Sequence, residues 1–211
     1  MIRVLIVDDQ RMSRENMEKI VQSSGRYLLA ASVTSADVAL TVCMQQPIDM
    51  ILMDVYTQGH RDGIDATVQI REKFPAIRII IVTSMPEASY LERAKKAGAD
   101  SFWYKETSQE ELIDVMDRTW KGEHIFPDRS PVVRLGQTTS ADLTEGEIRV
   151  LRQVMEGLEY DEIAGKLGVS TRTVQFHISN ILSKTGYANK TLLVIAVAKK
   201  QFIIPELDEE E

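Results

Sequence analysis

The chain of 211 residues contains one cysteine, Cys43, and lacks any apolar run near the roughly 18–20 residues that span a bilayer. One cysteine excludes an intrachain disulfide. Because no basic segment followed by an apolar stretch opens the sequence, we expect neither a secretion signal nor a membrane partner, and the protein to be cytoplasmic. Cys43 lies in an apolar helical pattern, which favours a packing role over a reactive one.

The sequence also lacks an excess of basic residues, since its net charge is −7. That charge is unevenly distributed. Residues 1–121 carry 15 basic and 18 acidic side chains, whereas residues 143–205 carry 8 basic and 6 acidic ones. The tail at 206–211 adds five acidic residues and is predicted to be disordered. The net charge of the whole chain therefore disfavours nucleic-acid binding, whereas the charge of the segment 143–205 is compatible with it.

The first 121 residues alternate between strand-like and helix-like patterns. The apolar runs fall at about 2–7, 28–33, 49–53, 78–82 and 101–104, and the helical patterns at about 11–24, 35–46, 64–74, 87–97 and 108–121. Nearly continuous Ile, Val and Leu runs indicate strands that are buried on both faces, as in a parallel sheet between helices. We therefore predict an α/β doubly wound domain with a five-stranded parallel sheet at 1–121.

The rhythm changes after residue 121. Residues 122–142 contain proline, glycine and small polar residues without apolar periodicity, which is typical of a linker. Helical patterns then follow at about 145–157, 160–167, 171–184 and 189–200. Thr144 and Glu147 have the spacing of a capping box at the start of the first of them. The segment 143–205 is thus predicted to be a small all-α four-helix domain.

Polar residues follow four of the predicted strands. Asp8 and Asp9 come after the first run, Asp54 after the third, Thr83 after the fourth and Lys105 after the fifth. Ligands of open α/β sheets bind at the carboxyl ends of the strands, so we expect these side chains to share one crevice. For any one residue a capping or solubility role is the simpler interpretation. The complete set instead suits a site that binds a divalent cation such as Mg²⁺ and a phosphoryl group, with one of its carboxylates as the nucleophile.

These residues resemble the signature of response-regulator receiver domains, over residues 1 to about 121. The resemblance implies a flavodoxin-like fold and phosphorylation of Asp54 by a sensor histidine kinase. It further implies that Asp9, Asp54 and the backbone carbonyl of Tyr56 hold Mg²⁺, while Asp8 acts mainly through metal-bound water.

The same resemblance assigns roles to three further residues. Thr83 and Lys105 would contact the phosphoryl group. Phe102, three residues before Lys105, falls at the switch aromatic of the family, although an ordinary core aromatic explains it equally well. The implied mechanism is that Thr83 moves towards the phosphate and Phe102 turns inward.

The loop after Asp54 departs from the family pattern. Gln58 stands where receivers usually have proline, and the usual glycine comes nine residues after the aspartate, as Gly63, instead of eight. We therefore expect a loop one residue longer, which affects its conformation but not the phosphate acceptor.

Residues 159–184 have the pattern of a helix, a tight turn and a second helix. Ser170 is placed to cap the second helix, and its apolar stripe consists of Val174, Ile178, Ile181 and Leu182. Such a helix, with one face buried and its N-terminal part exposed, suits the major groove of DNA. From the pattern alone, a generic helical bundle remains an alternative.

The sequence pattern from Leu143 to Lys184 resembles the LuxR-type DNA-binding domain, and the resemblance covers about 143–204. Together with the receiver and linker it resembles the NarL/FixJ class of response regulators. That class implies a transcription factor that forms a homodimer on phosphorylation and binds paired half-sites of double-stranded DNA.

The second resemblance locates candidate DNA contacts. By this resemblance Gln175, Phe176 and Ser179 match base-facing positions of the family. A Gln side chain can read adenine, and a Phe ring can touch a thymine methyl group. The candidates for the remaining contacts, mainly to phosphates, are Arg172, Thr173, Lys184 and Lys190.

The chain lacks several basic residues that are usual in the LuxR-type family, at Gln175, at Gly146 and at Tyr160-Asp161. We therefore expect modest DNA affinity that depends on dimerisation. An alternative is a response regulator that acts through protein contacts or as a phosphate sink. A metal-dependent phosphohydrolase is disfavoured, because such enzymes place two aspartates two residues apart whereas Asp8 and Asp9 are adjacent; we expect no enzyme in the usual sense.

Overall fold

The computed structural model describes residues 1–58, 62–87, 89–105 and 111–203. The acidic tail predicted at 206–211 lies outside these residues. The chain forms two compact units, the first with residues 1–84 and 89–129 and the second with residues 85–88 and the chain from Ser130. Each unit is described separately below.

The first unit is built on a five-stranded parallel sheet in the order β2-β1-β3-β4-β5. Its strands are β1 (Ile2–Val7), β2 (Tyr27–Val33), β3 (Met50–Asp54), β4 (Arg78–Thr83) and β5 (Ser101–Tyr104). The central strand β3 is buried at every position, as the continuous apolar runs indicated. The predicted doubly wound α/β fold is confirmed.

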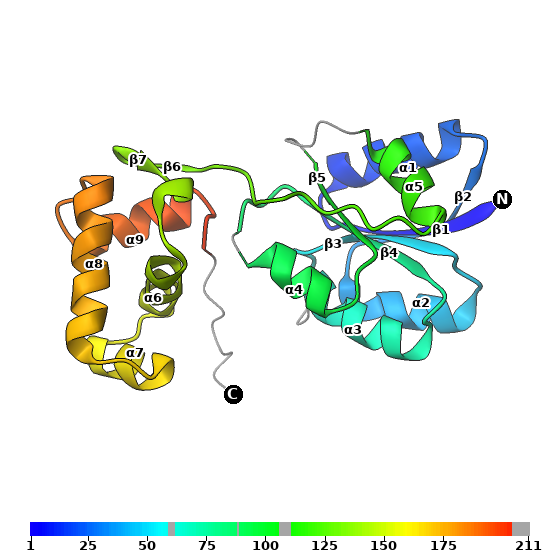
Figure 1. Ribbon diagram of the computed structural model, residues 1–211. Helices are drawn as coiled ribbons and strands as arrows, with labels where there is room; N and C mark the ends of the chain where they lie inside the picture. The colour runs from blue at the N-terminus through cyan, green and yellow to red at the C-terminus, as the bar shows by residue number, and fades with distance from the viewer. Residues whose placement is uncertain (59–61, 88, 106–110, 204–211) are drawn as a thin grey trace. The chain divides into compact units, whose positions relative to one another are not determined.

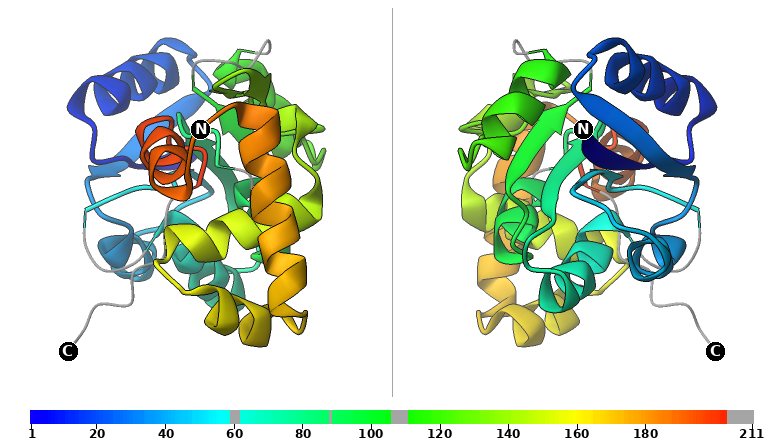
Figure 2. Two further views of the ribbon diagram at one scale, coloured as in Figure 1. Left: turned by 90° about the vertical axis from the view of Figure 1, so that its left-hand side faces the viewer. Right: turned by 90° about the vertical axis from the view of Figure 1, so that its right-hand side faces the viewer.

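Helices cover both faces of this sheet. They are α1 (Arg11–Ser23), α2 (Ala39–Gln45) after a short 3₁₀ turn η1 (Ala36–Val38), α3 (Gly63–Lys73), α4 (Tyr90–Lys96) and α5 (Leu112–Trp120). Helices α1 and α5 lie on one face, and α2, α3 and α4 on the other (Figure 1). The right-hand view of Figure 2 shows the same layers from the side. Met17 and Val21 of α1 and Val115 and Met116 of α5 pack on the sheet in one buried cluster.

Parallel pairing aligns the carboxyl ends of β1, β3, β4 and β5. Asp54 pairs with Val82, and Thr83 with Tyr104, so the strands end at nearly the same level. The residue after β5, Lys105, donates its backbone N–H to the carbonyl of Thr83 at 3.0 Å. The register therefore brings the polar residues that follow the strands to one edge of the sheet.

The second unit consists of helices and a short hairpin. Its elements are β6 (Arg134–Leu135), β7 (Thr138–Thr139), η2 (Ser140–Asp142), α6 (Glu145–Met155), α7 (Tyr160–Leu167), α8 (Thr171–Thr185) and α9 (Lys190–Lys199). The capping box of Thr144 and Glu147 at the start of α6 is confirmed. Helix α8, the long helix in the left-hand view of Figure 2, has 15 residues. None of the helices in the described parts of the two units is long and apolar enough to cross a membrane.

Residues 134–142, which the sequence assigned to the linker, are ordered parts of the second unit. Leu135 is fully buried in the same cluster as Leu151 and Ile181. Gln137 donates its backbone N–H to the carbonyl of Thr185 at the end of α8. Strands of two residues are too short to show alternation, so composition alone could not distinguish this hairpin from a linker.

Cys43 lies on α2 with 7% of its surface exposed, which confirms its packing role. Burial raises the pKa of its thiol to about 11. The side chain therefore stays protonated at neutral pH and is a poor nucleophile.

The hairpin turn generates a stability prediction. Gly136 has a φ of +62°, and a Cβ there would lie 2.0 Å from the carbonyl oxygen of Thr185. Gly157 has a φ of +84° with open space around it. We expect Gly157→Ala to cost about 1–2 kcal/mol from backbone strain alone, and Gly136→Ala to cost at least about 2 kcal/mol more because the hairpin must shift. Urea unfolding followed by circular dichroism measures both; equal losses would contradict the packing described for the hairpin.

Candidate functional site

The structure places the predicted acidic residues together at the carboxyl edge of the sheet. Asp8 and Asp54 are 0% and 2% exposed, and Asp9 is half-buried. Each of the three offers a carboxylate oxygen, and these atoms all lie within 4.8 Å of one another. Three carboxylates this close repel one another unless positive charge is near.

Lys105 supplies positive charge to this crevice. Its ammonium Nζ lies 2.7 Å from Oδ2 of Asp8 and 2.7 Å from Oδ2 of Asp54. One ammonium against three carboxylates leaves two negative charges when all are ionised. A divalent cation would balance them, and carboxylate oxygens are the ligands that Mg²⁺ prefers. The residues present therefore fit a bound Mg²⁺ by both charge and donor type.

The carboxyl group of Asp54 is a weaker acid than an ordinary aspartic acid side chain. Burial raises the pKa of its carboxyl to about 6, and the negative charge of Asp8 adds to the rise, while Lys105 opposes it. The backbone N–H of Tyr56 donates to Oδ1 of Asp54 at 3.3 Å. A carboxylate that is desolvated yet ionised near neutral pH is a competent nucleophile.

Asp8 is held from α1 by contacts that the sequence analysis missed. The hydroxyl of Ser13 donates to Oδ2 of Asp8 at 2.5 Å, and the N–H of Gln10 donates to Oδ1 at 2.8 Å. The guanidinium of Arg14 donates to the backbone carbonyl of Asp8 at 2.8 Å. A serine early in a helix has many ordinary roles, so its place in the sequence carried no signal of this contact.

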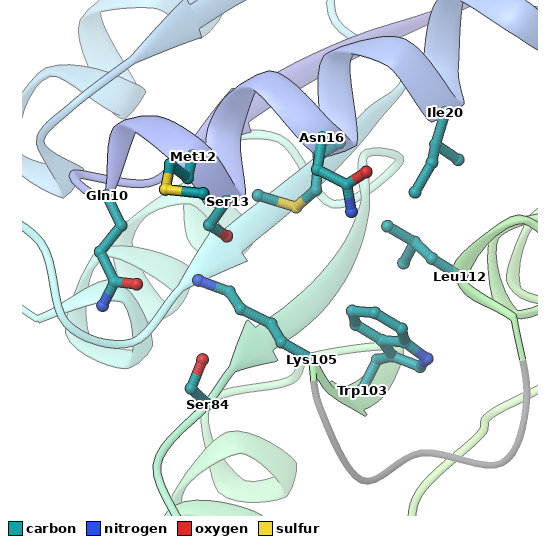
Figure 3. A pocket seen from close by; sticks show the side chains of 10 residues that line it. Gln10, Met12, Ser13, Asn16, Ile20, Ser84, Trp103, Lys105 and Leu112 are labelled. Atoms are coloured by element: carbon teal, nitrogen blue, oxygen red, sulfur yellow. The ribbon is translucent and has the colours of Figure 1, made fainter.

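A pocket of about 300 Å³ lies beside the crevice, between α1, the end of β5 and α5 (Figure 3). Ser13, Ser84 and Lys105 lie at its polar end, and Trp103 and Leu112 lie at its apolar end. The pocket thus connects the acidic crevice to the apolar layer beneath α1.

The two predicted switch residues are both buried. Thr83 is 0% and Phe102 is 1% exposed, and the Phe102 ring lies 4.9 Å from that of Tyr104. Phe102 therefore already lies inside the first unit in the state described. The expected turn of this ring on phosphorylation stays a prediction.

Gly63 closes the loop that follows Asp54. Its N–H donates to the carbonyl of Val55 at 2.9 Å, and a Cβ at this position would lie 2.0 Å from the carbonyl oxygen of Asp54. Only glycine fits so close to another backbone. Residues 59–61 of the loop lie outside the described residues, so the expectation of a longer loop stays a prediction.

In the second unit, α7 and α8 form a helix-turn-helix. Gly168 has a φ of +66° in the turn, and the Ser170 hydroxyl accepts from the N–H of Thr173, as the capping prediction required. Val174, Ile178 and Ile181 are buried. Four of the candidate DNA contacts are exposed on α8, namely Arg172, Gln175, Phe176 and Ser179.

Phe176, a candidate for contact with a thymine methyl group, is 62% exposed, so its ring is accessible to a partner.

The other candidate DNA contacts already have partners within the second unit. Lys184 donates to the buried carboxylate of Glu147 at 2.7 Å. The ammonium of Lys190 lies 5.2 Å from the centre of the Tyr160 ring. Thr173 shares a hydrogen bond with the Ser170 hydroxyl at 2.8 Å. Contacts of these three side chains with DNA would have to compete with these internal contacts.

Comparison with known families covers both units. Residues 4–117 match the response regulator receiver domain, and residues 141–197 match the luxR family of bacterial regulatory proteins. The chain belongs to the response regulators. This response regulator carries a receiver domain and a LuxR-type DNA-binding domain, an architecture of transcription regulators rather than of a known class of enzymes.

Two of the similar proteins cover nearly the whole response regulator, and a third covers more than half of it. The response regulator protein VraR of Staphylococcus aureus is 32% identical over 199 residues, which are 92% of this chain and 95% of that protein. A structure of RcsB from Salmonella enterica serovar Typhimurium, bound to promoter rprA in the presence of phosphomimetic BeF3−, has a TM-score of 0.62 at 21% identity, covering 94% and 98% of the two chains. A LuxR-family response regulator from an Aurantimonas species has a TM-score of 0.55 at 27% identity, covering 58% and 87%.

The pKa of Asp54 gives a prediction about stability in metal-free buffer. Because burial raises this pKa in the folded state from 3.8 to about 6, stability falls as pH rises through that range. Ionised Asp54 then lowers the free energy of unfolding by up to about 3 kcal/mol. We expect Asp54→Asn to be more stable than the wild type by about 1–3 kcal/mol at pH 8, and the difference to shrink at pH 5.

Asp49→Asn is a matched control for this experiment. The hydrogen bonds from Arg3 lower the pKa of the Asp49 carboxyl, so its ionised form stabilises the fold above pH 4. Asp49→Asn should therefore destabilise the response regulator at pH 8. Urea unfolding at both pH values measures the difference, and a destabilised Asp54→Asn at pH 8 would show that the contacts of Asp54 outweigh its desolvation.

Proposed function

We propose that this response regulator receives a phosphoryl group on Asp54 from a sensor histidine kinase, dimerises and binds promoter half-sites to control transcription. The observation that carries the proposal is the buried Asp54 carboxylate, which lies within 2.7 Å of the Lys105 ammonium and beside two further carboxylates. Buried groups whose pKa is shifted by desolvation and by a specific charged partner cluster at functional sites, which supports a reactive role for Asp54.

The proposed reaction is an attack of an Asp54 oxygen on the phosphorus of phosphohistidine. The O–P bond forms, the N–P bond breaks and the histidine ring leaves with the bonding electron pair. The ammonium of Lys105 contacts Asp54 before the reaction and the negatively charged phosphoryl oxygens after it. Asp9, Asp54 and the backbone carbonyl of Tyr56 are proposed to hold Mg²⁺, with Asp8 acting through a water. When bound, Mg²⁺ would neutralise charge on the phosphoryl oxygens.

The proposed switch begins at Thr83. This residue ends β4, next to the strand that carries Asp54, and its hydroxyl can hydrogen-bond a phosphoryl oxygen. A movement of Thr83 would shift the start of the chain segment that leads to α4. Because Phe102 is already buried, we assign the first step to Thr83 and not to the aromatic ring.

The exposed face of α8 supports the DNA-binding half of the proposal. Gln175 presents an amide that can pair with adenine, and Phe176 presents an apolar ring to a thymine methyl group. On α9, Leu192 and Ile195 are 46% and 45% exposed and lie three residues apart, which suits a dimer contact.

Phosphorylation has a direct test. Asp54→Ala should abolish labelling of the full chain by a small phosphodonor, because no other oxygen replaces the nucleophile. Asp65→Asn, a change at an exposed aspartate of α3, should leave labelling unchanged. Phosphate-affinity gel electrophoresis measures the labelled fraction. Undiminished labelling of the Asp54→Ala protein would refute the assigned acceptor.

DNA binding is tested by comparing two exposed residues of α8 in the phosphorylated full chain. Gln175→Ala should weaken binding to its promoter sequence by about 1–3 kcal/mol and leave the salt dependence unchanged. Arg172→Ala should reduce the slope of log K against log salt by about 1, because a phosphate contact is lost. Fluorescence anisotropy at several salt concentrations measures both. Lack of affinity for any genomic DNA at low salt would instead favour a regulator that acts through protein contacts or as a phosphate sink.

A further inference from the structure

We propose that Ser13 is a positioning residue of the acidic crevice, whose hydroxyl keeps Asp8 oriented for Mg²⁺ when Lys105 turns to the phosphoryl group. The inference rests on the proposed function, which assigns the metal and the phosphoryl group to this crevice. It adds a residue and a role outside the set of strand-end side chains.

The hydrogen bonds of Asp8 leave little of its carboxylate free. A carboxylate has about four acceptor positions, two on each oxygen. In the described part of the chain, Ser13 and Lys105 both donate to Oδ2, at 2.5 and 2.7 Å, and Gln10 donates to Oδ1. About one position remains, and it is on Oδ1. Asp8 is thus suited to accept one hydrogen bond from a water on the cation and not to bind the cation with both oxygens.

Helix α1 makes the Ser13 contact rigid. Ser13 is the third residue of the helix, and the next residue, Arg14, donates to the backbone carbonyl of Asp8. One turn of α1 therefore holds both the side chain and the backbone of Asp8. The helix is itself fixed on the sheet by buried Met17 and Val21. Figure 3 shows Ser13 and Lys105 directed towards the same end of the pocket.

The two donors to Oδ2 of Asp8 differ in what phosphorylation does to them. Lys105 carries a charge and also contacts Asp54. It is drawn towards the phosphoryl oxygens once the negative charge lies on them and no longer on the Asp54 carboxylate. The hydroxyl of Ser13 is neutral and comes from a helix, so it stays. Asp8 is fully buried, and a buried carboxylate oxygen without a donor is costly. Ser13 therefore supplies the contact that persists in both states.

The test is a Mg²⁺ titration of the full chain, followed by tryptophan fluorescence because Trp103 lies in the same pocket. Ser13→Ala should weaken Mg²⁺ binding about tenfold, the usual effect of removing a residue that orients a metal ligand. Ser13→Thr retains the hydroxyl and should bind Mg²⁺ like the wild type. Ser13→Cys keeps the size but donates weakly, and should resemble Ser13→Ala.

Ser23→Ala is the matched control, because the Ser23 hydroxyl donates to a carbonyl of its own helix, α1, away from the crevice. Its Mg²⁺ affinity should equal that of the wild type. Labelling by a small phosphodonor gives a second measurement. The rate of Ser13→Ala should be low at limiting Mg²⁺ and recover at saturating Mg²⁺, since the defect is one of metal affinity.

Three results would overturn the inference. Equal Mg²⁺ affinity of Ser13→Ala and the wild type would show that the hydroxyl does not orient Asp8. Weak binding by Ser13→Thr would assign the effect to side-chain shape. A wild-type chain that does not respond to Mg²⁺ would refute the proposed metal site itself, whereas the first two results refute only the role of Ser13.

Discussion

The ammonium group of Lys105 is shared between two buried carboxylates, and the chemistry of the first unit depends on that shared contact. It lies 2.7 Å from both Asp8 and Asp54, and its charge offsets part of the cost of burying the two acids. The compensation is incomplete, because the pKa of Asp54 remains raised to about 6. The ionised Asp54 carboxyl therefore still carries a desolvation cost. Further positive charge in the crevice, or a reaction that moves the negative charge of Asp54 outward, would reduce this cost. The same shared contact thus stabilises the folded receiver and sets the charge state of the proposed phosphate acceptor.

The sequence predicted the crevice because its position follows from where the parallel strands end. Each polar residue came directly after an apolar run, and parallel strands must end at one edge of the sheet. The helices of the second unit were predicted for a similar reason, since Thr144, Ser170 and Gly168 carry local signals of helix ends. In both cases the signal is a local one, a polar residue at the end of an apolar run or a residue that favours a helix end.

What the sequence did not reveal depends on contacts between distant segments. The hairpin at 134–139 is ordered by burial of Leu135 and by a hydrogen bond to the end of α8. The ammonium of Lys184 on α8 is paired with Glu147, 37 residues away, which no spacing within α8 could show. Phe102 is a similar case, because its position in the sequence cannot say which way the ring points. Family patterns assign such residues a role, but packing decides whether they are available for it.

Gly63 has a consequence for how loops of this kind vary in length. The hydrogen bond between Gly63 and Val55 closes the loop at its base, and the backbone of Gly63 lies against the carbonyl of Asp54. Both anchors lie at the base of the loop, next to the end of β3. A change in the number of residues between these two anchors would therefore alter the outer surface of the first unit while leaving Asp54 and the sheet edge in place.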